Sequence, residues 1–171
     1  METYEAIIKR ASVREYTDKP IGKEILEKLV DAGRRAPSAR AVEPWEFIVV
    51  TDKKILQQIG QAAASGSFIK DAAACLVIFC QDTKYYLEDG CAATENILLL
   101  AADLGLGACW VAGDKKPYAP AISELLKVPA AYKLISLISL GWPKQETRQS
   151  KQRALSAVIH WEGFNRAYKK V

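Results

Sequence analysis

A strand followed by a helix, both apolar on almost every side, restricts the fold more than any other feature of this sequence. Residues 75–80 read Cys-Leu-Val-Ile-Phe-Cys, which leaves no strongly polar position to face water. Such a strand belongs in the middle of a sheet that is covered on both faces. Residues 83–104 follow with more apolar positions than one amphipathic face needs. We therefore expect this helix at the centre of the fold or in a subunit interface.

Helix and strand patterns alternate through the rest of the chain. Apolar residues at helical spacing, or a proline at a helix start, predict further helices over 3–11, 22–35, 53–64 and 120–127. Runs rich in β-branched and aromatic residues predict further strands over 45–51, 108–111 and 134–140. Thr3, Asp52 and Asp82 are the predicted N-caps, and Gly105 is expected to end the central helix. The element order is then α-α-β-α-β-α-β-α-β, in a single domain spanning 1–171.

Composition excludes several classes of protein. The longest apolar run, 72–80, is far shorter than the ~20 residues that cross a bilayer. The acidic N-terminus does not fit a secretory signal, so we expect a cytoplasmic protein without membrane contact. Cys75, Cys80, Cys91 and Cys109 have neither redox-pair nor zinc-ligand spacing, and we expect four buried thiols. His160 is the one histidine, which argues against a histidine-based triad or metal site.

The net charge of +4 is gathered in three stretches, 9–14, 34–40 and 144–153. Stretches so far apart in the sequence could converge on one anion. A nucleic-acid-binding module is the weakest interpretation, because no helix-turn-helix, RNP or zinc-finger pattern accompanies the charge.

One basic motif lies where the first helix ends. Arg10, Ser12 and Arg14 alternate, so they point the same way if the chain is extended there. Two guanidinium groups and a hydroxyl on one side would suit a phosphate. Cations near a helix C-terminus also favour the helix dipole, and the residues alone leave both interpretations open.

A glycine-rich segment, 105–113, follows the central helix with the sequence Gly-Leu-Gly-Ala-Cys-Trp-Val-Ala-Gly. Glycine allows a flat ligand to approach the backbone closely. The spacing matches neither a dinucleotide fingerprint nor a P-loop. An ordinary helix stop followed by a strand is the other interpretation.

Five segments in order resemble the FMN-dependent nitroreductase family, over nearly the whole chain. They are Arg10-x-Ser12-x-Arg14-x-Tyr16, Ala36-Pro37-Ser38 followed by Pro44-Trp45-x-Phe47, Asn96, Gly105-Leu-Gly107-x-x-Trp110, and Val158-Ile-His160-Trp161. The resemblance implies an α+β fold with a central, mostly antiparallel (mixed) sheet flanked by helices. It also implies an intertwined homodimer with FMN at the subunit interface.

The resemblance assigns cofactor-binding roles and no catalytic side chain or metal. The implied contacts are Arg10, Ser12, Arg14, Lys151 and Arg153 at the FMN phosphate, Pro37, Ser38 and Ala39 from the other subunit, and Trp110, Val111, Ala112 and Gly113 along the flavin ring. Ser65 or Lys70 is a candidate donor to the ring's N1 and O2 atoms. In this pattern His160 belongs to a packing segment.

This chain departs from the family pattern in places. Ala41 and Glu43 stand where many members carry Asn and Gln, and Ala73-Ala74 replaces the usual Ala-Pro. At 171 residues the chain also lacks room for the helices that cover the site in longer members, so we expect a more open site.

The resemblance implies that NAD(P)H reduces the flavin, leaves, and is replaced by a nitroaromatic, quinone or similar small-molecule acceptor, in a ping-pong cycle. Two alternatives stay open. One is a different flavin reaction on the same fold, such as dehalogenation or oxidative ring cleavage. The other is a non-enzymatic FMN-binding or regulatory protein.

Overall fold

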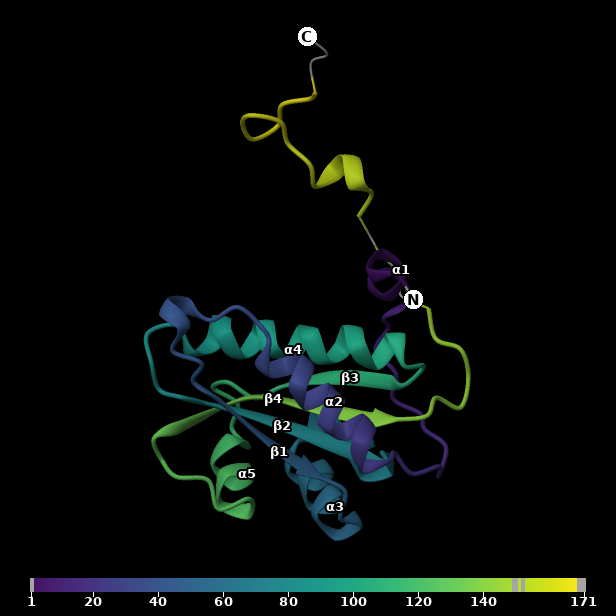
Figure 1. Cartoon of the computed structure of the whole chain (residues 1–171), viewed down its shortest axis with the longest axis vertical. Coiled ribbons are helices and arrows are strands. Elements are labelled where there is room, and N and C mark those ends of the chain that lie inside the picture. Colours follow the sequence, from purple (N-terminus) through teal and green to yellow (C-terminus); the bar gives the residue numbers. More distant parts are fainter. Residues whose placement is uncertain (1, 149–150, 152, 169–171) are drawn as a thin grey trace.

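The predicted order of helices and strands is confirmed in a computed structural model, which describes residues 2–148, 151 and 153–168 (Figure 1). The helices are α1 (Thr3–Lys9), α2 (Lys23–Arg34), α3 (Lys53–Ala62), α4 (Tyr86–Asp103) and α5 (Ala119–Leu125). The strands are β1 (Trp45–Val50), β2 (Ala74–Gln81), β3 (Gly107–Ala112) and β4 (Tyr132–Gly141). Three 3-10 segments, η1 (Ala39–Ala41), η2 (Ala64–Asp71) and η3 (Leu155–Ala157), were not predicted.

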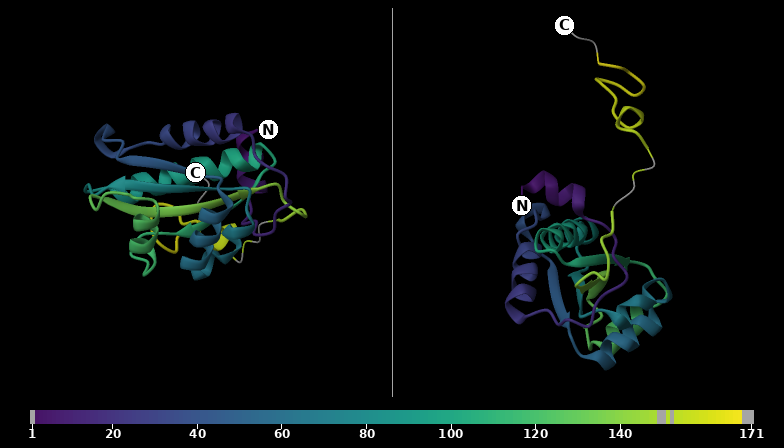
Figure 2. Two further views of the ribbon diagram at one scale, coloured as in Figure 1. Left: turned by 90° about the horizontal axis from the view of Figure 1, so that it is seen from below. Right: turned by 90° about the vertical axis from the view of Figure 1, so that its right-hand side faces the viewer.

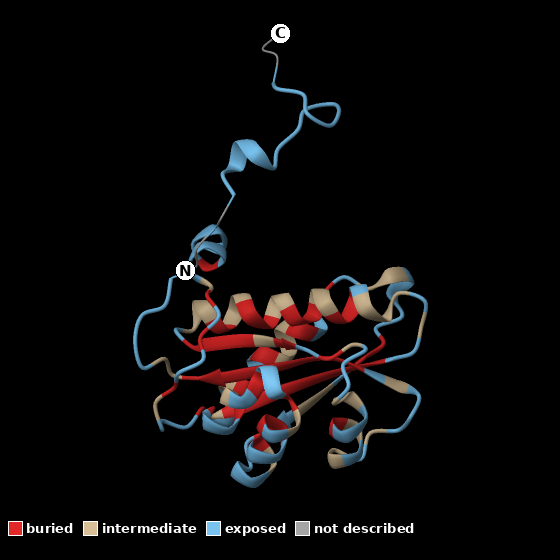
Figure 3. Ribbon diagram, turned by 180° about the vertical axis from the view of Figure 1, so that it is seen from behind, coloured by how far each residue is buried: buried red, intermediate tan, exposed pale blue. Residues whose placement is uncertain are grey.

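The four strands form one antiparallel sheet in the order β1-β2-β4-β3. The predicted α+β class is confirmed, and the all-apolar strand β2 lies inside the sheet with every residue but Gln81 buried. Two hydrophobic clusters cover the two faces: α2 and α4 pack on one, and α3, η2 and α5 on the other. Figures 1 and 3 show these layers, with the buried residues concentrated in the sheet and on the inner side of α4. Strands β1 and β3 are the sheet's edges.

The central helix α4 lies close to the sheet because of a glycine. A Cβ at Gly90 would come within 2.7 Å of Ile135 on β4. The side chains of α4 that face the sheet are buried, whereas Leu99 and Leu100 on other sides of the helix are half-buried. Helix α4 thus has the predicted apolar surface beyond its sheet-facing side, and the rest of the chain covers this surface only in part.

Two of the predicted helix boundaries are confirmed and two are wrong. The Asp52 carboxylate accepts from Lys54 N at 2.9 Å and from Ile55 N at 3.0 Å, and Gly105 follows α4 with φ of 75°. Thr3 is already inside α1, after Glu2. Asp82 does not cap α4, because its backbone N–H bonds to Ala131 O and its carboxylate lies 3.3 Å from Lys133 Nζ. These contacts stabilise a turn after Asp82, and α4 therefore begins at Tyr86 and not at residue 83 as predicted.

The cysteine prediction also needs a correction. Cys75, Cys80 and Cys109 are buried free thiols, but Cys91 on α4 is only half-buried, at the margin of the cluster between this helix and the sheet. Within the described ranges, no helix is both long and apolar enough to cross a membrane.

The C-terminal arm, defined here as residues 153–168, projects away from the sheet and helices (Figures 1 and 2). Every one of these residues is exposed. Leu155 is 75% exposed and Phe164 is 81% exposed. The predicted packing segment around His160 is therefore exposed, and the contacts of His160 lie within the arm: its ring lies 4.4 Å from that of Phe164, and Nδ1 accepts from Asn165 N.

Candidate cofactor site

The basic N-terminal motif and the glycine-rich strand, far apart in the sequence, lie side by side. Ser12 forms a parallel bridge with Ala108 on β3, and Val13 N donates to Ala108 O at 3.0 Å. Gly107 permits this approach, because a Cβ there would come within 2.6 Å of the Val13 side chain. The candidate site begins where these two segments meet.

Beyond Ala108 the outer edge of β3 is open to a ligand. Ala108 directs its carbonyl away from β4, toward Val13. Because backbone direction alternates along a strand, Trp110 and Ala112 also present their N–H groups to this edge. Val111 pairs with Leu137 on β4, and Gly113 N donates to Ile135 O at 2.9 Å. Of the four residues predicted to contact the flavin ring, Trp110 and Ala112 thus offer backbone N–H donors at this edge. Val111 and Gly113 are bonded within the sheet instead.

The two arginines of the motif turn to different neighbours. Arg10 ends α1, and its Nε lies 3.4 Å from Glu95 Oε1 on α4. Arg14 lies over the Phe68 ring of η2, with 5.7 Å from its guanidinium carbon to the ring centroid. The buried side chains of this segment are Ala11 and Val13. Arg10, Ser12 and Arg14 therefore share one stretch of backbone, but the two cations lie at different points along the β3 edge.

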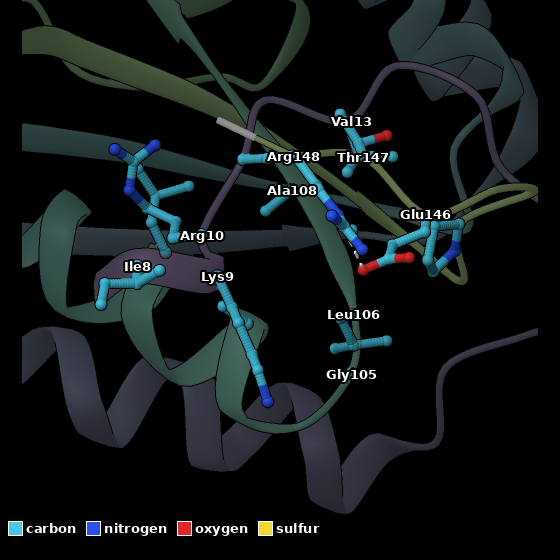
Figure 4. A pocket seen from close by; sticks show the side chains of 15 residues that line it. Ile8, Lys9, Arg10, Val13, Gly105, Leu106, Ala108, Glu146, Thr147 and Arg148 are labelled. Atoms are coloured by element: carbon cyan, nitrogen blue, oxygen red, sulfur yellow. Dashed lines mark hydrogen bonds and ion pairs between the residues drawn. The ribbon is translucent and has the colours of Figure 1, made fainter. Parts of the chain in front are cut away.

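Arg10 also lines a pocket of about 540 Å³ between α1, the C-terminal end of α4, the turn at Gly105 and the segment after β4. Figure 4 shows Lys9 and Arg10 on one side of the pocket and Arg148, paired with Glu146 at 3.4 Å, on the other. Lys151 and Arg153 are exposed and do not line it, and the Arg153 guanidinium donates to Ala157 O. Arg148 was not singled out from the sequence, although it belongs to the same basic run.

The far end of β3 is framed by η2 and the start of α5. Gly66 lies so close to β3 that a Cβ there would come within 3.1 Å of the Val111 side chain. The Tyr118 hydroxyl donates to Ala112 O. Burial raises the pKa of Tyr118, and the Ser65 hydroxyl beside it works in the opposite direction. Of the two candidate donors, Ser65 lies at this end, whereas Lys70 packs its backbone against Gly60 of α3.

Pro37, Ser38 and Ala39 lie near the start of α4, at the opposite end of this helix from the Arg10 pocket. The buried carboxylate of Asp89, 4% exposed, accepts from Ser38 Oγ at 2.9 Å and from Ala39 N at 3.0 Å. Ala102, near the other end of the helix, lines the pocket with Arg10. Thirteen residues separate Asp89 from Ala102, about 20 Å of helix. One chain therefore does not bring this segment to the Arg10 pocket.

The segment that Asp89 holds has an unusual backbone. Arg40, Ala41 and Glu43 have φ of 59°, 53° and 50°. Glu43 N donates to Ser38 Oγ at 2.8 Å, so the hydroxyl is engaged on both sides. The sequence gives no signal that distinguishes Asp89 from the other acidic residues of this helix, such as its neighbour Glu88. Asn96, from the family pattern, donates to Ala32 O at 3.0 Å and ties α4 to α2.

The chemistry of these donors fits a flat ligand that carries a phosphate. Arg10 lies toward one end of the β3 edge, and backbone N–H groups follow along it, with Arg14 over the Phe68 ring. Among the described residues no group of His, Cys, Asp or Glu could hold a metal ion. The fold and the site together define an α+β protein in which arginine side chains lie beside an open edge strand of the sheet.

Comparison with known proteins gives the family. The nitroreductase family model matches residues 7–88 and 80–142, and the chain belongs to the nitroreductase family. An Archaeoglobus fulgidus protein named "Putative NADH dehydrogenase/NAD(P)H nitroreductase" is 38% identical over 85% of this chain and 87% of its own. A solved structure of an FMN-dependent nitroreductase from Clostridium difficile R20291 is 34% identical, with a TM-score of 0.87 over 93% of this chain and 98% of that one. A Desulfovibrio desulfuricans structure in complex with FMN is 27% identical, with a TM-score of 0.85 over 96% and 98% of the two chains.

Proposed function

We propose that this protein is an NAD(P)H-dependent oxidoreductase that uses FMN. The observation that carries the proposal is the contact between the Arg10–Arg14 segment and the open edge of β3. Names of relatives point the same way, among them an NADPH-flavin oxidoreductase of Vibrio harveyi, 26% identical, and an FMN reductase of Bacillus subtilis, 26% identical. The fold supports it as well, through the likeness to the FMN complex described above.

The chain's part is to bind and orient the cofactor. Arg10 and Ser12 hold the phosphate, with Arg148 across the pocket, and Lys151 and Arg153 join them once the arm is packed. Trp110 and Ala112 N–H groups serve the ring edge, Val111 and Gly113 hold β3 in the sheet, and Arg14 lies beside the ring over Phe68. FMN, when bound, supplies the hydride and electron chemistry, so few protein groups need to titrate. This agrees with a single histidine that lies on the exposed arm.

The proposed acceptors are nitroaromatics, quinones or similar small molecules, which use the site in turn with NAD(P)H. The short connection between β3 and α5, residues 113–118, supports this interpretation because it inserts no helix over the β3 edge. An uncovered site allows the donor to leave and an acceptor of varied shape to enter.

We propose a homodimer in which each site takes Pro37, Ser38 and Ala39 from the other subunit. Three observations support it: the half-buried apolar side chains of α4, the exposed apolar arm, and the distance along α4 between Asp89 and the pocket. The open edge of β1 provides backbone groups on which an arm from a second chain could pair.

The absorption spectrum of the purified protein, with and without added FMN, tests the cofactor. A colourless protein that takes up no FMN would remove the basis of the proposal. Stopped-flow mixing of the FMN-loaded protein with NADH or NADPH then tests the activity. Bleaching of the flavin, followed by its return on addition of a quinone or nitroaromatic, supports the oxidoreductase, whereas a flavin that stays oxidised supports an FMN-binding protein without this activity.

A further inference from the structure

Tyr16 carries a buried hydroxyl group that the cofactor contacts proposed above do not use. It is 3% exposed, and its ring lies against Gly141, where a Cβ would come within 2.6 Å of the ring. The hydroxyl lies 2.6 Å from Val13 O and 2.6 Å from Ser139 Oγ on β4. A carbonyl only accepts, so the tyrosine proton points to Val13 and the serine hydroxyl donates to Tyr16. Burial raises the pKa of Tyr16, which keeps the hydroxyl protonated.

The peptide that accepts this bond lies between the two site residues Ser12 and Arg14. On its N-terminal side, Ser12 is bridged to Ala108 and Val13 N is bonded to Ala108 O. On its C-terminal side, Tyr16 bridges Pro143 and Thr17 N donates to Trp142 O at 2.8 Å. The segment is thus attached to the sheet at both ends. Within the described contacts, the Tyr16 hydroxyl is the side-chain group that fixes the Val13 carbonyl between them.

We propose that Tyr16, supported by Ser139, is a positioning residue that orients the Val13–Arg14 peptide and so directs Arg14 toward bound FMN. This inference rests on the proposed function. Fixing the Val13 carbonyl limits rotation of the peptide from which Arg14 starts, and it keeps the guanidinium over Phe68 beside the β3 edge. Arg14 is exposed, and ordering a long side chain with many rotamers costs entropy on binding, so a fixed backbone at its start lowers that cost.

The test is FMN titration, followed by quenching of flavin fluorescence, of the wild type and of Tyr16→Phe. The phenylalanine ring keeps the contact with Gly141 and removes only the hydroxyl. We expect FMN affinity to fall by roughly fivefold to tenfold, as for one net hydrogen bond. Ser139→Ala should weaken FMN binding in the same direction by a smaller factor. Tyr132→Phe, a half-buried tyrosine at the far end of β4, should bind FMN like the wild type.

A double-mutant cycle separates positioning from a general structural effect. If Tyr16 acts through Arg14, Tyr16→Phe changes FMN affinity by less than about twofold when Arg14 is already alanine. An equal loss in both backgrounds, or no loss in the wild-type background, would overturn the proposal. Far-ultraviolet circular dichroism and thermal melting identify a folding defect, and in that case Ser139→Ala in the same cycle decides. Failure of the wild type to bind FMN would instead count against the proposed function itself.

Discussion

Replacing Asp89 with alanine should destabilise the protein more than any other single acidic substitution on α4. The carboxylate is buried and accepts from Ser38 Oγ at 2.9 Å and Ala39 N at 3.0 Å. A hydrogen bond to a charged group contributes about 1.5–3 kcal/mol, and two of them are lost together. Release of a buried charge offsets part of this loss, so we expect the free energy of unfolding to fall by about 3–5 kcal/mol. Asp89→Asn keeps one oxygen acceptor and should cost about half as much.

The assay is urea unfolding at one fixed protein concentration, since proposed dimer formation would make apparent stability depend on concentration. Ser38→Ala removes one of the two donors and should fall between the wild type and Asp89→Ala. Asp31→Ala is the matched control: this carboxylate is paired with Arg34 and Arg35 in solvent and should leave the unfolding midpoint nearly unchanged. An Asp89→Ala protein within about 1 kcal/mol of wild type would refute the argument that this carboxylate holds the 37–39 segment.

Three further predictions test the cofactor site, the arm and the buried thiols. Arg10→Ala combined with Arg14→Ala should weaken FMN binding at least 100-fold, because two charged contacts are removed; unchanged affinity in a fluorescence titration would exclude both as contacts. A chain ended after residue 148 should lose dimer mass in analytical ultracentrifugation and bind FMN more weakly, whereas an unchanged dimer would show that the arm does not join the subunits. Stability should decline as pH rises from 9 toward 12, because burial raises the pKa of Cys75 from 9.0 to about 12, so the unfolded chain loses this proton while the folded chain keeps it. Urea midpoints at pH 8, 9 and 10 measure the decline, and a Cys75→Ala protein with the same decline would contradict that cause.

Sequence patterns predict the fold well where apolar residues are dense and regular. Strand β2 and helix α4 needed no other information, because long, dense runs of apolar residues leave few alternatives for 75–80 and 83–104. Local chemistry predicts the Asp52 cap and the Gly105 stop correctly. Asp82 fails as a cap for a long-range reason. Its partners, Ala131 and Lys133, lie at the start of β4, far from Asp82 in the sequence, so local patterns do not reveal them.

The sequence predicts which segments form the candidate site, but it predicts less well where their side chains point. Motif order locates Arg10, Arg14 and Trp110, and the contact between Ser12 and Ala108 agrees with it. Alternation alone predicted that the two arginines would converge, but Arg10 still belongs to the helix end and turns to Glu95. Phe68, Tyr118 and Arg148 complete the surroundings through tertiary contacts for which single residues give no sequence signal.

The central helix α4 supports the proposal that two chains together complete each site. Its C-terminal half lines the Arg10 pocket, and its N-terminal half anchors Ser38 through Asp89. A rigid helix keeps these ends about 20 Å apart, so neither can reach the other within one chain. Two antiparallel copies of α4, packed through the half-buried residues such as Leu99 and Leu100, would bring the Ser38 end of one chain to the pocket end of the other. In this arrangement each site takes Arg10 from one subunit and the segment held by Asp89 from the other. A mixed dimer of the two single variants should therefore retain one intact site. A dimer of the double variant should have none.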